Sequence, residues 1–133
     1  MRAPVTALYA ALLTVVFLVL SVRVIARRSA GGVSLGVAGV PALERAARVH
    51  ANFAEYVPLA LLTMLLVESA GYSAWLVHVL GVALLVGRAS HAFGVSRAPE
   101  DFRFRVSGIA LTLTVLGTAA FLLLMSNVLG LTV

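Results

Sequence analysis

The chain has 133 residues and contains no cysteine. It can therefore form no disulfide, and it supplies neither a thiolate metal ligand nor a cysteine nucleophile of its own. It also contains no lysine, so all ten of its basic residues are arginines. Only 11% of the residues are charged, whereas a soluble domain carries about a quarter. This scarcity of charge, with 62% hydrophobic residues, indicates a membrane protein.

Four hydrophobic segments are each long enough to span a bilayer as an α-helix, which takes about 20 residues. We place these spans at about residues 4–25, 45–68, 74–93 and 104–130. No small-residue cleavage pattern follows the first span, so we expect it to be retained rather than removed as a signal peptide. The sequence predicts a single all-α domain over residues 1–133, folded as an integral membrane four-helix bundle.

The arginines give this bundle an expected orientation. Nine of the ten lie in or beside the segments that join the first span to the second and the third span to the fourth. Cytoplasmic loops of membrane proteins are enriched in arginine and lysine. We therefore expect both Arg-rich loops in the cytoplasm and both termini outside, with only Arg2 against this orientation. Arginines at the ends of membrane segments do not form a soluble basic patch, which argues against a nucleic-acid partner.

A polar stripe begins the second span. At 100° per residue, Arg45, Arg48, Asn52 and Glu55 fall within a stripe about 80° wide, whereas His50 points elsewhere. A charge deep in a span costs about 2.5–3.5 kcal/mol by insertion scales, and such groups usually face the bundle interior. Glu55 could pair with an arginine of a neighbouring helix or contact a ligand. The arginines could snorkel to lipid headgroups, but their alignment with Asn52 favours an anionic ligand.

A second polar cluster follows on the other two spans. Arg88 and His91 share a face of the third helix, and Arg103 and Arg105 open the fourth. A structural histidine and helix-end anchors are the simpler readings. A metal site needs three or four ligands, and His78, one of the three histidines, lies toward the opposite membrane face. We therefore predict no metal site, and the chain also lacks phosphate-loop, serine-elbow and zinc-protease motifs.

The second span carries a pattern that resembles the second-helix signature of the MAPEG family, the membrane-associated proteins in eicosanoid and glutathione metabolism. The resemblance covers essentially the whole chain and is closest to the small bacterial inner-membrane branch. It rests on Glu44-Arg45-x-x-Arg48-x-His50-x-Asn52-x-x-Glu55-Tyr56-x-Pro58-Leu59, on Ala26-Arg27-Arg28 and Val33-Ser34-Leu35-Gly36, on Gly87-Arg88-x-x-His91-x-x-Gly94, and on Arg105-x-x-Gly108-x-x-Leu111-Thr112.

This resemblance implies a homotrimer of four-helix subunits that binds glutathione as a co-substrate between neighbouring subunits, near the cytoplasmic face. Arg105 matches the arginine that is thought to stabilise the thiolate of glutathione. Arg103 is the other candidate, and we favour Arg105 because Gly108 follows it at the third position. Carried over by position, the residues that would hold glutathione are Arg27, Arg28, Arg48, Asn52, Glu55, Tyr56, Arg88 and His91.

The resemblance further implies a membrane-embedded glutathione transferase or peroxidase. The thiolate would attack a lipophilic electrophile, or reduce a lipid hydroperoxide, that enters from the bilayer. Ala51 and Val95 depart from residues of the prostaglandin- and leukotriene-forming branches, which argues against an eicosanoid substrate. The alternative is a non-catalytic membrane scaffold, or an anionic-lipid-binding protein, that keeps the same fold. In both cases we expect membrane lipids as partners and the bacterial inner membrane as the location.

Overall fold

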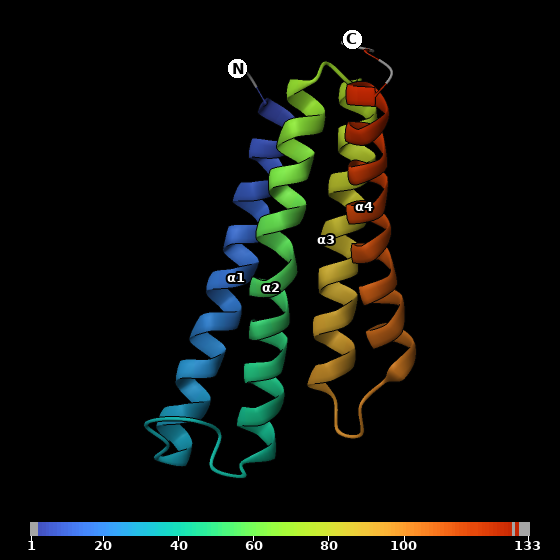
Figure 1. Cartoon of the computed structure of the whole chain (residues 1–133). Coiled ribbons are helices and arrows are strands. Elements are labelled where there is room, and N and C mark those ends of the chain that lie inside the picture. The colour runs from blue at the N-terminus through green and yellow to red at the C-terminus, as the bar shows by residue number, and fades with distance from the viewer. Residues whose placement is uncertain (1–2, 129, 131–133) are drawn as a thin grey trace.

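The computed structural model describes residues 3–128 and 130, and it consists of four long α-helices (Figure 1). Within these residues there is no strand, which confirms the predicted all-α class. All four helices are long and apolar enough to cross a membrane. Residues 1, 2, 129 and 131–133, part of the predicted domain and of its last span, lie outside the described residues. The helices are α1 (Pro4–Gly31), α2 (Pro41–Ser69), α3 (Ala74–Ser96) and α4 (Phe102–Val128).

The helices reach beyond the predicted spans because local signals, rather than the bilayer, end them. α1 continues to Gly31, where Gly32 adopts a left-handed conformation and donates its N–H to the carbonyl of Ser29. α2 begins at Pro41, which needs no N–H partner in the first turn. The 28 residues of α1 extend about 42 Å, more than the roughly 30 Å of a hydrocarbon core.

The chain runs alternately up and down, so its loops gather at two ends (Figure 1). The α1–α2 loop (residues 32–40) and the α3–α4 loop (residues 97–101) lie at one end. The α2–α3 loop, the start of α1 and the end of α4 lie at the other. The two segments that the sequence marks as rich in arginine are thus on the same side of the bundle, and we call this the arginine end.

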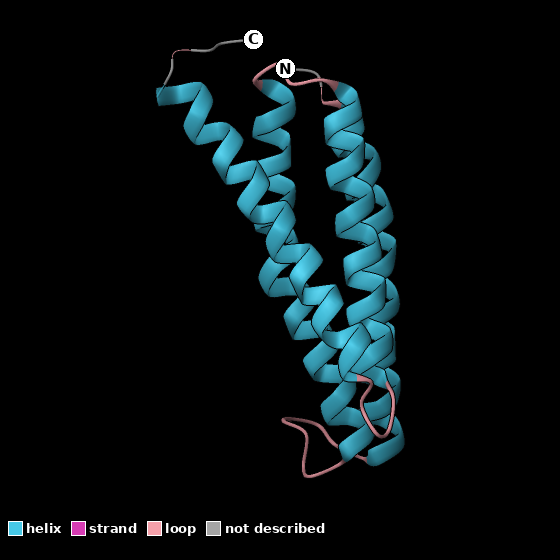
Figure 2. Cartoon of the chain, turned by 90° about the vertical axis from the view of Figure 1, so that its right-hand side faces the viewer, coloured by secondary structure: helices cyan, strands magenta, loops and turns pink. Residues whose placement is uncertain are grey.

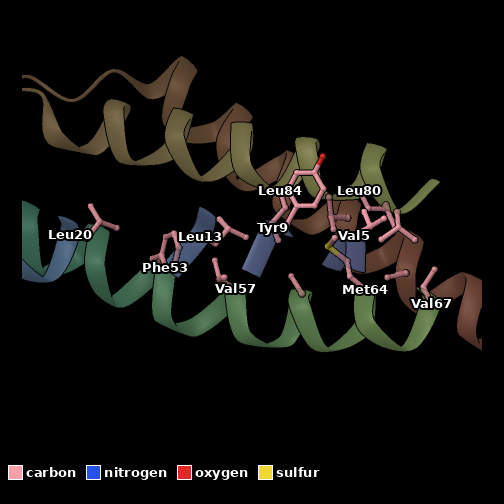
Figure 3. Packing of buried hydrophobic residues seen from close by; sticks show 14 of the residues in the cluster. Val5, Tyr9, Leu13, Leu20, Phe53, Val57, Met64, Val67, Leu80 and Leu84 are labelled. Carbon is pink, nitrogen blue, oxygen red and sulfur yellow. The ribbon is translucent and has the colours of Figure 1, made fainter. Parts of the chain in front are cut away.

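Residues spaced four and three apart on α2 form its buried face: Phe53, Val57, Ala60, Met64 and Val67 are each at most 3% exposed. Figure 3 shows the side chains of Phe53 and Val57 beside Leu13 of α1. The opposite faces of the helices carry exposed apolar residues, such as Leu59 on α2. The interior is therefore a single apolar core, and the outer surface suits a lipid environment.

Glycines let α3 and α4 come very close at the arginine end. A Cβ added to Gly94 would lie 2.5 Å from the backbone nitrogen of Arg105. A Cβ on Gly108 would overlap the backbone of His91 and the carbonyl oxygen of Gly87. Figure 2 shows that α4 leans away from the other helices toward its C-terminal end. The glycine crossing thus joins α3 to the first turns of α4 and brings Arg105 next to His91.

The other end of the bundle is held by Glu68 near the end of α2. Ala3, the N-cap residue of α1, makes no side-chain cap hydrogen bond. Instead, the Glu68 carboxylate accepts the backbone N–H groups of Val5 at 2.9 Å and Thr6 at 2.7 Å. One turn further along α1, the Tyr9 hydroxyl and His78 Nδ1 share a 3.1 Å hydrogen bond. A carboxylate at a helix N-terminus satisfies free donors and complements the helix dipole, so Glu68 attaches α1 to α2.

The glycine crossing yields a first prediction. Gly108→Ala should destabilise the protein by about 2 kcal/mol or more, because its methyl group would overlap backbone that cannot move alone. Gly117→Ala is the matched control on the same helix, because nothing lies within 4 Å of its Cβ position. It should be neutral or stabilise by up to about 1 kcal/mol. Thermal unfolding in detergent, followed by circular dichroism, measures both, and equal behaviour of the two variants would contradict the crossing.

The attachment of α1 yields a second prediction. Glu68→Gln removes one carboxylate oxygen and the negative charge that two backbone N–H groups share. We expect a loss of about 1 kcal/mol in the free energy of unfolding. Ser69→Ala, at the adjacent exposed position, should stay within about 0.5 kcal/mol of the parent protein. Hydrogen exchange of the first turn of α1 should rise only in Glu68→Gln, and an unchanged rate would exclude the proposed cap.

Candidate functional site

A cavity of about 370 Å³ opens at the arginine end, between α2, α3 and the start of α4. Its volume falls within the range of roughly 300–1,000 Å³ that is typical of small-molecule sites. Seven of its nine lining residues are polar or charged, which distinguishes it from the apolar core. The lining residues are Pro41, Glu44, Arg45, Arg48, Asn52, His91, Val95, Glu100 and Arg105.

The first turns of α2 form one wall of this cavity. Arg45, Arg48 and Asn52 all line it, because positions three and four apart share one face of a helix. Ala46 and Val49, which lie between them in the sequence, are buried on the adjoining side of the helix. Burial of the apolar side therefore turns the predicted polar stripe toward the cavity. Arg48 is exposed and Arg45 is half-buried, so both guanidinium groups are within reach of a ligand from the solvent.

His91 of α3 and Arg105 of α4 form the facing wall. Within the described residues, the buried Nδ1 atom of His91 has no hydrogen-bond partner. Arg105 pairs through Nη1 with Glu100 Oε2 at 2.5 Å, and the two side chains are 46% and 32% exposed. This is the one ion pair found among residues 3–128 and 130. Glu100 thus holds the Arg105 guanidinium at the opening of the cavity, which we call its mouth. Arg45 and Arg48 form no ion pair among these residues, so their guanidinium groups can bind other anions.

Arg88 lies below the cavity rather than in its lining. It is 1% exposed, and its Nη2 atom donates to Asn52 Oδ1 at 2.7 Å. Its Nη1 atom donates to Thr112 Oγ1 of α4 at 3.4 Å. Its guanidinium carbon lies 5.7 Å from the centre of the Phe53 ring. Arg88 therefore joins three helices under the floor of the cavity.

Other residues that the resemblance selects lie away from this cavity. Glu55 is exposed on α2, fourteen residues from each end of the helix, and Tyr56 beside it is half-buried. Arg27 is exposed near the end of α1, and Arg28 donates to the carbonyl oxygen of Gly36 at 2.6 Å. In one chain the cavity thus unites Arg48, Asn52, His91 and Arg105, supported by Arg88, and excludes Arg27, Arg28, Glu55 and Tyr56.

His50 belongs to the α1–α2 contact. Its Nε2 atom lies 3.1 Å from Ser21 Oγ, and its ring centre lies 4.8 Å from that of Phe17. The prediction that His50 points away from the polar stripe is confirmed. Its contacts are with α1, and they help to align the two helices below the arginine end.

Two functional neighbours escaped the sequence reasoning. Glu100 lines the cavity because the short α3–α4 loop turns it back toward Arg105. Its place five residues before Arg105 was the available signal, but loop conformation is not readable from spacing. Thr112 contacts Arg88 only because α3 and α4 cross closely. Helical spacing within one span could not reveal either contact, because the first depends on the conformation of the loop and the second on how α3 and α4 pack.

Comparison with known proteins places this architecture in a family. The model of the MAPEG family matches residues 6–125. The inner membrane protein YecN of Escherichia coli strain K12 is 38% identical over 108 residues, which cover 81% of each chain. YecN of Escherichia coli O6:H1 strain CFT073 matches to the same extent. No solved structure matches the chain significantly. Since the family match spans most of the described helices and more than a third of the aligned residues are identical in the relatives, the chain belongs to the MAPEG family.

Proposed function

We propose that the protein is a glutathione-dependent transferase or peroxidase of a bacterial inner membrane. The observation that carries this proposal is the arginine-rich cavity in which Arg105 of α4 stands beside His91 of α3. Membership of the MAPEG family supports the choice of glutathione as the thiol. The inner-membrane location is supported by the name of the Escherichia coli relatives. The gathering of the arginine-bearing loops at one end supports a cytoplasmic position for that end and an outside position for both termini.

The cavity suits a small anionic peptide. Arg45 and Arg48 present guanidinium groups, which match carboxylates in a two-pronged geometry. Asn52 adds a neutral polar contact between them and the floor. Glu44 stands at the same wall and suits an ammonium group. Glutathione carries two carboxylates, one ammonium group and a thiol, so each of its charged groups has a counterpart among these residues.

Arg105 is the residue we assign to the reactive thiol. A free thiol has a pKa of about 8.5, and the thiolate is the nucleophile. A cation within about 4–6 Å favours the charged form. In the transferase reaction, the sulfur forms a bond to an electrophilic carbon while the leaving group departs with its electron pair. In the peroxidase reaction, the sulfur takes the terminal oxygen of a lipid hydroperoxide, the O–O bond breaks, and the lipid oxygen takes up a proton and leaves as the alcohol. A second glutathione thiol then attacks the sulfenic sulfur, which gives the disulfide and releases water.

Oligomerisation would complete the site. Glu55 is exposed at the midpoint of α2, and a charge at such a depth in lipid costs about 2.5–3.5 kcal/mol. A second subunit packed over this face would remove Glu55 from lipid. In the homotrimer that we propose, Glu55 and Tyr56 of one chain, and Arg27 and Arg28 near the end of α1, would reach glutathione between subunits. The lipophilic substrate would enter this site from the surrounding bilayer.

A third prediction tests the enzyme assignment. Purified protein in detergent should bind glutathione at millimolar concentration or below, and it should conjugate glutathione to an aryl halide. Arg105→Ala should keep the oligomer and lower turnover about 100-fold, by analogy with the loss of one charge-stabilising donor. Arg103→Ala is the matched control, because Arg103 is exposed and outside the cavity lining. Intact oligomers without glutathione binding or turnover would instead support the alternative, a scaffold or anionic-lipid-binding protein.

A fourth prediction concerns the pair at the cavity mouth. Glu100 occupies one side of the Arg105 guanidinium, so an incoming thiolate must compete with it. Exposed ion pairs contribute about 0–1 kcal/mol. Glu100→Gln should therefore bind glutathione about two- to fivefold more tightly.

The control is Asp101→Asn, since the Asp101 carboxylate accepts the backbone N–H of Arg103 rather than contacting Arg105. Calorimetric titration gives both affinities. The formation of bound thiolate, followed by its ultraviolet absorbance, should also move to lower pH in Glu100→Gln. Weaker binding in this variant would mean that Glu100 contacts the ligand directly.

A further inference from the structure

The resemblance groups Arg88 with the residues that touch glutathione, but its burial gives it another place. We propose that Arg88 is a positioning residue, which holds the Asn52 amide so that it presents hydrogen-bond donors to the cavity. The ligand must then place a carbonyl or carboxylate oxygen at Asn52. This inference rests on the proposed function, because it defines how the same cavity selects its thiol ligand.

The Arg88 guanidinium is shielded from the solvent. Arg88 is 1% exposed and does not line the cavity. Its hydrogen bonds in the described chain go to two neutral groups, the Asn52 amide oxygen at 2.7 Å and the Thr112 hydroxyl at 3.4 Å. A buried cation is costly unless polar atoms surround it. Arg88 therefore depends strongly on the oxygen of Asn52.

The hydrogen bonds of Arg88 can run in only one direction. A guanidinium has only donors, so it can accept nothing from the amide. If the Asn52 amide were turned over, its N–H₂ group would face the N–H groups of Arg88 in a donor–donor contact. Thr112 obeys the same rule, because its hydroxyl donates to the carbonyl oxygen of Gly108 at 2.9 Å and can accept from Arg88. Arg88 thus donates in both of these hydrogen bonds, and the Asn52 oxygen and the Thr112 hydroxyl accept.

The contact with Arg88 leaves the Asn52 amide nitrogen for the cavity. Asn52 lines the cavity, and its oxygen is already used. Its Nδ2 group carries two N–H donors, and no protein acceptor for them is found among residues 3–128 and 130. The Asn52 side chain is half-buried at the cavity wall, so these donors are available to a bound ligand. A ligand oxygen would satisfy Asn52, whereas an ammonium group at the same place would be repelled.

Glutathione meets this requirement, since it has two carboxylates and two peptide carbonyl groups. A thiol that lacks every such oxygen, such as cysteamine, does not. The decisive variant is Asn52→Asp, which keeps the size of the side chain and an oxygen for Arg88. It replaces the two donors by a second acceptor and turns the neutral contact with Arg88 into an ion pair.

We expect Asn52→Asp to bind glutathione about tenfold or more weakly, with an unfolding temperature at or above that of the parent protein. Its rate of aryl halide conjugation with cysteamine should not fall, because the new carboxylate attracts the ammonium group of cysteamine, which the amide donors of Asn52 repel. Asn127→Asp is the matched control: Asn127 is exposed near the end of α4, and the variant should behave as the parent. The inference is overturned if Asn52→Asp binds glutathione normally, or if both thiols lose the same factor.

Arg88 itself is tested without any ligand. The chain has only two asparagines, Asn52 and Asn127, so ¹⁵N-asparagine labelling gives two side-chain amide signals, and Asn52→Asp identifies one of them. Arg88→Lys keeps one donor and Arg88→Met keeps none. The Asn52 signal should shift in both variants, more in Arg88→Met, while the Asn127 signal stays in place.

An Asn52 signal that is unchanged in Arg88→Lys would overturn the positioning role, even if Arg88→Met does not fold. If this signal shifts but the parent protein binds no glutathione, the positioning contact is supported and the proposed function fails. The two ideas are therefore separable. In a protein that does bind glutathione, affinity should fall in the order parent, Arg88→Lys and Arg88→Met, with little change in the cysteamine rate.

Discussion

The close crossing of α3 and α4 is the constraint on which the rest of the arginine end depends. Gly94 and Gly108 lack the Cβ atoms that would separate the two backbones, so the helices approach where each carries a functional side chain. Dispersion contacts over such a crossing need no polar group, which suits a protein whose outer surface is apolar. The crossing sets the distance between His91 and the first turn of α4, and it lets Thr112 reach Arg88 from the far side.

The cavity combines a rigid floor with an adjustable mouth. Arg88 is buried and bonded on two sides, and its partners lie on two other helices. Arg105 and Glu100 are partly exposed and stand at a short loop, where an ion pair is weak enough for a ligand to replace it. In the transferase that we propose, the floor would hold the peptide in one orientation, and the opening of the cavity would exchange one anion for another. Arg48 extends the positive potential toward the solvent.

Two glutamates of α2, Glu68 and Glu55, lie in different environments. At one end, Glu68 fixes the start of α1 through backbone hydrogen bonds, so its charge is used within the chain. Glu55, at the midpoint of α2, has no such use among the described residues and faces outward. One half-buried carboxylate thus anchors a helix, and another lies unpaired on the apolar outer surface among the described residues, which is consistent with a surface that a second subunit covers.

Hydrophobic length and charge distribution determined the four helices, their order and the shared side of the arginine-bearing segments, because a bilayer admits few architectures. Spacing on α2 also determined that Arg45, Arg48 and Asn52 share a face. The helix ends depend on local caps such as Gly32, which the prediction of the spans did not take into account. Only the tertiary structure decided that His91 and Arg105 join that face, that Glu100 closes the mouth, and that Arg88 lies under the floor. The physical reason is that the contacts of His91 and Arg88 link different helices, and their geometry follows from glycine-mediated packing rather than from the periodicity of any one segment. The contact of Glu100 follows from the turn of the α3–α4 loop.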